Sequence, residues 1–85
     1  PALVAATLQG DDIILCQITS QSRQDSYAIN LSDSDFRQGS LHVPSMIRPN
    51  RLFTAEKSIV IYKIGALKED KIIEVKEKII EIFEE

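Results

Sequence analysis

The sequence contains few of the residues on which common enzyme sites are built. Its 85 residues include one cysteine, Cys16, one histidine, His42, and no tryptophan. A disulfide framework needs cysteine pairs, and zinc sites need cysteine and histidine ligands at short spacings. The three glycines, Gly10, Gly39 and Gly65, are isolated, so the sequence has no glycine-rich phosphate loop. With neither a metal motif nor a nucleotide motif, we expect no cofactor.

Long apolar runs are also absent. No stretch is long enough to span a bilayer and no signal-peptide pattern occurs, so we expect no membrane partner. The lone Cys16 lies inside the apolar run from Ile13 to Ile18, where a small buried hydrophobe is the usual role of a cysteine. A single cysteine without a disulfide partner suits a reducing compartment, which predicts a cytoplasmic protein.

Negative charge is in excess only at the C-terminal end of the sequence. Residues 68–85 carry four lysines and seven acidic residues, and their net charge of −3 equals that of the whole chain. Arginine occurs only in the middle of the chain, at Arg23, Arg37, Arg48 and Arg51. The overall charge therefore gives no argument for a nucleic-acid partner. Clustered guanidinium groups would suit a local phosphate site, and solvated loop arginines are the alternative interpretation.

Residues 1–64 have the pattern of several short β-strands. Two apolar runs, 1–8 and 11–19, flank the turn sequence QGDD, which predicts a β-hairpin. Both runs suit strands that are covered on both faces. Further strands are expected at 26–31, at 41–49 as an edge or bulged strand broken by Pro44, at 52–54 and at 58–64.

The hydrophobic period changes from that of a strand to that of a helix over residues 68–85. Glu69 and Asp70 would lie in the first helical turn, where negative charge is favourable. The stripe that follows helical spacing consists of Ile72, Ile73, Lys76, Ile79, Ile80 and Phe83. Five or six strands followed by one helix predict an α+β chain or a small β-barrel, formed as a single domain of residues 1–85.

Two polar clusters are candidates for chemistry. Asp33 and Asp35 lie in a serine-rich segment, 32–40, that is expected to be a loop or a single helical turn, and capping and solvation explain their carboxylates. Thr19, Ser20 and Gln21 instead end a strand without the usual Gly, Pro, Asn or Asp. Hydroxyl and amide groups with arginines suit phosphodiester chemistry, in which positioning and charge stabilisation do most of the work.

Four stretches of the sequence, in order, resemble the MazF/PemK toxins, the ribonuclease halves of bacterial and archaeal toxin–antitoxin pairs. These stretches are "PALV" (1–4), "ITSQ" (18–21), "QGSLHVPSMIRPNRLFTAEKSIV" (38–60) and "KIGALKED" (63–70), the last followed by an amphipathic helix. The resemblance covers essentially the whole chain.

The resemblance implies a fold, an activity and partners. The implied fold is a small SH3-like β-barrel of antiparallel strands followed by a C-terminal helix, usually assembled as a homodimer. The implied activity is that of an mRNA interferase, which cleaves single-stranded RNA without a metal. In that reaction the ribose 2′-hydroxyl attacks the adjacent phosphate and leaves a cyclic phosphate and a 5′-hydroxyl. The implied partner is a cognate antitoxin, typically an acidic, extended tail that lies over the RNA groove.

The resemblance also assigns roles to particular residues. The family's catalytic Thr or Ser falls on Thr19, which would stabilise the phosphate. RNA contacts are expected from Ser20, Gln21, Arg23, Arg48 and Arg51. The family's catalytic arginine directly precedes the proline of "PALV", a position upstream of Pro1 that this sequence does not contain. We therefore expect the 85-residue chain by itself to be inactive or strongly impaired.

Two other functions remain open at the level of the sequence. Toxins of the CcdB kind use the same barrel to bind and poison DNA gyrase, which would make the C-terminal helix functional and Thr19 structural. A non-catalytic remnant that binds or dimerises is the second alternative, and it becomes the best account if the gene begins near Pro1. Supercoiling inhibition without RNA cleavage would distinguish the gyrase-directed toxin from the ribonuclease.

Overall fold

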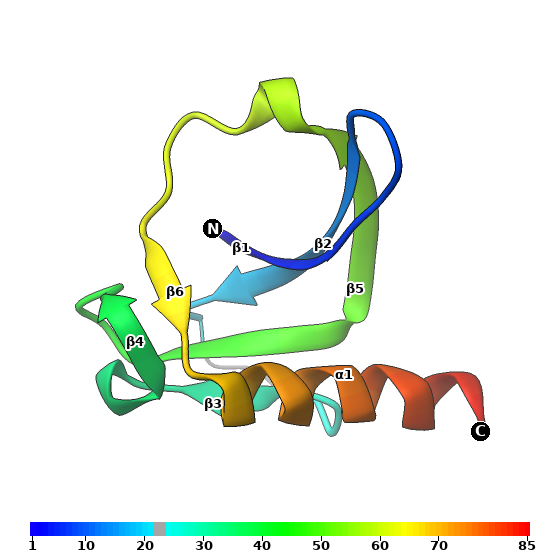
Figure 1. Cartoon of the computed structure of the whole chain (residues 1–85). Coiled ribbons are helices and arrows are strands. Elements are labelled where there is room, and N and C mark those ends of the chain that lie inside the picture. The colour runs from blue at the N-terminus through cyan, green and yellow to red at the C-terminus, as the bar shows by residue number, and fades with distance from the viewer. Residues whose placement is uncertain (22–23) are drawn as a thin grey trace.

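The fold is a curled antiparallel sheet with one helix packed beneath it (Figure 1). The computed structural model describes residues 1–21 and 24–85. Its elements, in order, are β1 (Ala2–Thr7), β2 (Asp12–Thr19), β3 (Ile29–Leu31), a 3₁₀ turn (Asp33–Asp35), β4 (Phe36–Gly39), β5 (Ser45–Glu56), a second 3₁₀ turn (Lys57–Ile59), β6 (Gly65–Leu67) and α1 (Glu69–Phe83).

The strands form one sheet of four and one pair. The larger sheet has the order β1-β2-β5-β3, and β4 pairs with β6. All pairings are antiparallel, and the larger sheet curls into a half-barrel, as Figure 1 shows. This architecture confirms the expected small SH3-like barrel with a C-terminal helix.

The predicted N-terminal hairpin is present. β1 and β2 pair from Ala2 opposite Gln17 to Thr7 opposite Ile13, with one bulge in β1. The turn is closed by the Leu8 N–H, which donates to the Asp12 carbonyl at 3.1 Å. Gly10 has a φ of +81°, a conformation that favours glycine because any other side chain would be strained there. The turn predicted from QGDD is therefore present in the structure.

β5 differs from the strand expected over residues 41–49. It pairs with both β2 and β3, so it is a central strand, and the expectation of an edge strand was wrong, whereas the alternative of a bulged strand agrees with a register shift within β5, although not at Pro44. Pro49 lies within it, at a point where the register jumps from Cys16 opposite Leu52 to Gln17 opposite Arg48. Residues 49–51 therefore leave the β2 ladder, and the absent proline N–H breaks no bond there. Figure 1 shows β5 turning a corner near its middle.

The strand expected at 58–64 is the second difference. Residues 57–59 form a 3₁₀ turn and residues 60–64 belong to no strand. Regular pairing resumes in β6, opposite β4, which was expected to be a loop or helical turn. The two strands approach closely because both carry glycine, and a Cβ on Gly65 would collide with the Gln38 carbonyl. The alternating side chains of residues 58–64 predicted a strand, but a strand also needs a neighbouring strand with which its backbone can form hydrogen bonds.

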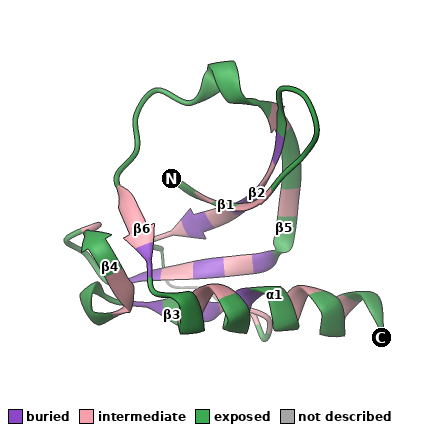
Figure 2. Cartoon of the chain, in the orientation of Figure 1, coloured by how far each residue is buried: buried purple, intermediate pink, exposed green. Residues whose placement is uncertain are grey.

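The core lies between the curled sheet and α1 (Figure 2). It consists of Cys16, Ile18, Ile29, Leu31, Ile47, Leu67 and Val75. On α1, Val75 is 1% exposed, whereas Ile80 is 56% exposed and Phe83 is 77% exposed. The buried stripe is thus rotated from the one expected, because Val75 rather than Ile80 faces the sheet. Within the described part of the chain, no helix is both long and apolar enough to cross a membrane.

Candidate functional site

Thr19 is the last residue of β2, opposite Met46 on β5. The Gln21 N–H donates to Thr19 Oγ1 at 3.1 Å, which turns the chain away from the sheet as soon as the strand ends. Oγ1 is therefore an acceptor in this turn, and its own proton bonds no acceptor among the described residues. Ser20 and Gln21 are exposed beside it. The arrangement leaves the hydroxyl proton available to an anion above the strand end.

Strand geometry places more polar groups on the same face as Thr19. Alternate residues of a strand share a face, so Gln17 lies with Thr19, and their partners Arg48 and Met46 share that face on β5. Ile18, between them, points to the core. The odd-numbered face of β2 therefore changes from buried apolar residues to partly buried polar ones at its C-terminal end.

Arg48 is brought to the Thr19 face, but other side chains hold its guanidinium. Arg48 Nε donates to Asp25 Oδ2 at 2.8 Å, and Arg48 Nη1 donates to Gln17 Oε1 at 3.1 Å. The Arg48 and Asp25 side chains are only 11% and 5% exposed. The hydrogen bond from Arg48 holds the pKa of the Asp25 carboxyl below its usual range. The expected RNA-binding arginine is thus one half of a buried ion pair.

The other two arginines expected to bind RNA are placed differently. Arg51 is exposed and lies in the part of β5 that leaves the β2 ladder. Among the described residues, no hydrogen bond or ion pair joins Arg51 to Thr19. Arg23 lies outside the described residues. Of the expected set, the structure brings together Thr19, Ser20, Gln21 and, on the same face, Arg48.

The beginning of β1 lies beside the end of β2. Ala2 is opposite Gln17, and the Ile18 N–H donates to the Pro1 carbonyl at 3.1 Å. Continuing this antiparallel register, a residue placed directly before Pro1 would fall opposite Thr19. The start of the "PALV" stretch therefore lies beside the "ITSQ" stretch, at the end of the hairpin opposite the turn.

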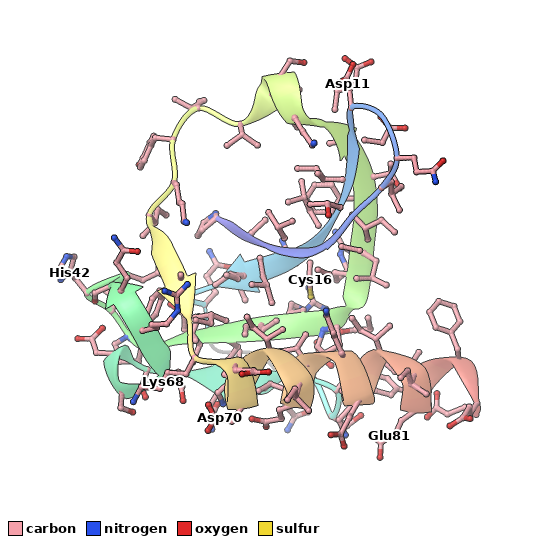
Figure 3. All side chains as sticks on the ribbon, in the orientation of Figure 1. Asp11, Cys16, His42, Lys68, Asp70 and Glu81 are labelled. Atoms are coloured by element: carbon pink, nitrogen blue, oxygen red, sulfur yellow. The ribbon has the colours of Figure 1, made fainter. Side chains whose placement is uncertain are left out.

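Cys16 is a core residue, as the sequence predicted. It is fully buried, its thiol donates to the Arg48 carbonyl at 3.0 Å, and burial raises its pKa to about 11. His42 lies beyond β4, far from Cys16 in Figure 3, so the two do not form a nucleophile–base pair.

The carboxylates of the serine-rich segment are used locally. Asp35 Oδ2 accepts a hydrogen bond from the Ser32 N–H at 2.9 Å, which completes a capping box at the first 3₁₀ turn. Asp33 accepts a hydrogen bond from the Ser40 hydroxyl. Both contacts agree with the capping role expected for this segment.

Sequence reasoning missed Asp25. Within the polar stretch SQSRQDSY it resembles a solvated loop residue. Its partner Arg48 is 23 residues further along the chain, and the pairing depends on the register of β5 against β2. The sequence signal was only the general habit of Asp side chains to accept a hydrogen bond from the backbone N–H two residues on, as Asp25 does from Tyr27.

Comparison with known proteins shows the family to which the chain belongs. No curated protein sequence matches the chain. A family model described as "PemK-like, MazF-like toxin of type II toxin-antitoxin system" matches residues 1–83, which include the hairpin, Thr19, β5 and all of α1. This chain is therefore a member of the PemK-like, MazF-like toxins of type II toxin–antitoxin systems.

Proposed function

We propose that the protein is a metal-independent endoribonuclease that cleaves single-stranded RNA and is neutralised by a cognate antitoxin. The observation that carries the proposal is the position of the Thr19 hydroxyl. The Thr19 hydroxyl ends β2, its proton bonds no acceptor among residues 1–21 and 24–85, and the start of β1 lies next to it. Family membership supports the toxin context, and a hydroxyl donor at a strand end suits the stabilisation of a phosphate oxygen.

The proposed reaction needs positioning and one strong donor. The substrate 2′-oxygen loses its proton and bonds to the adjacent phosphorus, while the bond from phosphorus to the 5′-oxygen breaks. The departing 5′-oxygen takes up a proton, which leaves a 2′,3′-cyclic phosphate and a 5′-hydroxyl. Thr19 donates to a non-bridging oxygen as negative charge grows there. The resemblance assigns the proton transfers to an arginine directly before the proline of "PALV", opposite Thr19 by register.

Nearby residues would hold the RNA. Ser20 and Gln21 are exposed next to Thr19 and have donors and acceptors suited to base or ribose groups. Arg51 is exposed and would bind a backbone phosphate, and Arg23 keeps the same proposed role. Arg48 already bonds Asp25 and Gln17, so its contribution to RNA binding is through that network.

The same site suits the proposed antitoxin. An acidic extended segment would cover the surface that we propose for RNA, since arginines that attract phosphates also attract carboxylates. A homodimer in the cytoplasm is the assembly that we propose for the toxin, following the habit of its family.

The test is RNA cleavage by the protein expressed from its complete reading frame. We expect Thr19→Ala to lower the cleavage rate about 100-fold, because a donor to developing negative charge is lost. Thr19→Ser, which keeps the hydroxyl, should stay close to wild type. Mass spectrometry of the products should find cyclic phosphate ends, and EDTA should leave the rate unchanged. Wild-type cleavage by Thr19→Ala would overturn the assignment of Thr19.

The exposed apolar edge of α1 favours one alternative. Ile73, Ile80 and Phe83 are 47%, 56% and 77% exposed and offer a helical surface for a protein target. A gyrase-directed toxin would use such a surface. If the protein inhibits supercoiling and leaves RNA intact, and if Phe83→Ser abolishes that inhibition, the gyrase-directed function replaces the ribonuclease.

A further inference from the structure

Asp25 carries a largely buried negative charge and is not one of the residues proposed to contact RNA. Its carboxylate is 5% exposed and its partner Arg48 is 11% exposed. Removing two charges from water costs free energy that their attraction only partly offsets, so a buried pair is weak evidence for stability. Such a pair is better explained by the geometry that it imposes, and the surroundings of Asp25 show which geometry that is.

Both carboxylate oxygens of Asp25 have fixed partners. Oδ2 accepts from Arg48 Nε at 2.8 Å, and Oδ1 accepts from the Tyr27 N–H at 3.0 Å. The Asp25 carbonyl accepts from the Ala28 N–H at 3.1 Å, which closes a turn before β3. The Tyr27 hydroxyl donates to the Glu85 carboxylate at 2.8 Å. Asp25 therefore joins the turn before β3 to the central strand β5, and Tyr27 joins that turn to Glu85, two residues after the end of α1.

These contacts connect Asp25 to the candidate site through side chains. Asp25 binds Arg48, Arg48 binds Gln17, and Gln17 is two residues before Thr19 on the same face of β2. At the end of that strand the Gln21 N–H donates to Thr19 Oγ1. Thr has few χ1 rotamers, and this hydrogen bond selects among them on the face that the Asp25 network occupies.

We infer that Asp25 is a positioning residue, which through Arg48 and Gln17 fixes the polar face at the end of β2 and so aims the Thr19 hydroxyl at the scissile phosphate. The inference rests on the proposed ribonuclease function for its catalytic consequence. Asp25 itself does not touch RNA, since its oxygens are occupied and buried. Its loss should therefore act on the rate of the chemical step and leave substrate affinity nearly unchanged.

The first experiment compares Asp25→Asn with wild type, using the product of the complete reading frame and a short single-stranded RNA. We expect kcat to fall roughly 10- to 100-fold while KM stays within about threefold. Asp25→Glu, which keeps the charge, should recover most of the loss. Val75→Ala is the matched control, because it weakens the core on the other face of the sheet and should leave kcat unchanged. Equal kcat in wild type and Asp25→Asn would overturn the inference.

A second variant guards against unfolding of the first. Asp25→Leu combined with Arg48→Met removes both charges, so no unpaired charge stays buried and the fold should survive. We expect the folded double variant to show the same loss of kcat. A folded double variant with wild-type kcat would contradict a positioning role.

A structural readout separates this inference from the proposed function. Hydrogen exchange of the Gln21 amide reports its bond to Thr19 Oγ1 without any RNA. We expect that amide to exchange at least about tenfold faster in Asp25→Asn than in wild type, and unchanged in Val75→Ala. If wild-type protein cleaves no RNA but Gln21 still responds in this way, the ribonuclease proposal fails and the positioning inference stands. Unchanged exchange in a folded Asp25→Asn would overturn the positioning inference.

Discussion

Cys16 and Asp25 both bind Arg48, and the two contacts have opposite electrostatic effects. The Cys16 thiol donates to the Arg48 carbonyl and stays neutral, because burial raises its pKa to about 11. Asp25 accepts from the Arg48 guanidinium and stays ionised, because that bond lowers its pKa. The backbone of Arg48 thus contacts the apolar core through Cys16, while its side chain contacts the charged Asp25. Each contact leads to a prediction at this scale.

The Cys16 thiol should be inert while the protein is folded. A pKa of about 11, against an ordinary value of 9.0, leaves roughly 100-fold less thiolate at pH 8 than in the unfolded chain. We expect the disulfide reagent DTNB to react at least about 100-fold more slowly with native protein than with protein in guanidinium. Since the neutral form is favoured in the fold, stability should also fall as pH rises above 9.0. Rapid reaction of native protein at pH 8 would show that Cys16 is accessible.

Ionised Asp25 should contribute more to the stability of the fold at neutral pH than in acid. The pKa of Asp25 is lowered in the fold, so its contribution is complete above the unfolded value near 3.9 and is lost as pH falls through the folded value. We expect Asp25→Asn to cost about 3 kcal/mol at pH 7, because Arg48 is left buried and unpaired. Guanidinium unfolding at several pH values should show this difference shrinking below pH 4. A difference that stays constant down to pH 3 would contradict the depressed pKa.

At the scale of elements, local patterns identified the hairpin and the helix. The apolar runs and the QGDD turn predicted β1 and β2, and helical spacing predicted α1. Sequence reasoning failed where the outcome depends on partners distant in the chain. β5 is central because β2 and β3 lie on its two sides, and residues 60–64 form no strand because no described strand pairs with them. Thr19 was proposed from the family motif and stays a prediction, whereas the place of Asp25 depends on the register between β2 and β5.

The orientation of α1 gives a prediction about stability. Val75 is 1% exposed against the sheet, whereas Ile80 is 56% exposed although both are apolar. We expect Val75→Ala to cost about 2 kcal/mol because it leaves a cavity, and Ile80→Ala to cost less than about 0.5 kcal/mol. Chemical denaturation of the two variants side by side measures both values. Equal losses would mean that the helix packs through the stripe predicted from the sequence.

At the scale of the whole molecule, the second 3₁₀ turn and the connection from it to β6 expose several large apolar side chains. Ile61 is 91% exposed and Tyr62 is 73% exposed, and their neighbours Ile59, Val60 and Ile64 are also exposed. Monomers rarely leave adjacent large apolar side chains uncovered. The surface is therefore expected to associate when the chain is studied alone.

Self-association of the 85-residue chain tests this expectation. Sedimentation velocity should show a weight-average size that rises with concentration, and Ile61→Lys should reduce that rise. Val43→Lys is the control, since Val43 is 51% exposed elsewhere on the surface and its replacement adds the same charge. If both lysine variants behave like wild type, the segment 59–64 makes no contact between copies.

The pairing of β2 with β5 also determines at which stage of protein synthesis the site around Thr19 can form. Thr19 and Gln17 are made early, but their partners Met46 and Arg48 follow about 30 residues later. Contacts between residues so distant in sequence form late and cooperatively, since the intervening chain must be ordered first. A ribosome-bound chain that ends before β5 therefore has the Thr19 hydroxyl without the strand that places it. We expect a nascent toxin to be harmless to its own messenger until β5 has emerged, which leaves an interval for the antitoxin to meet it.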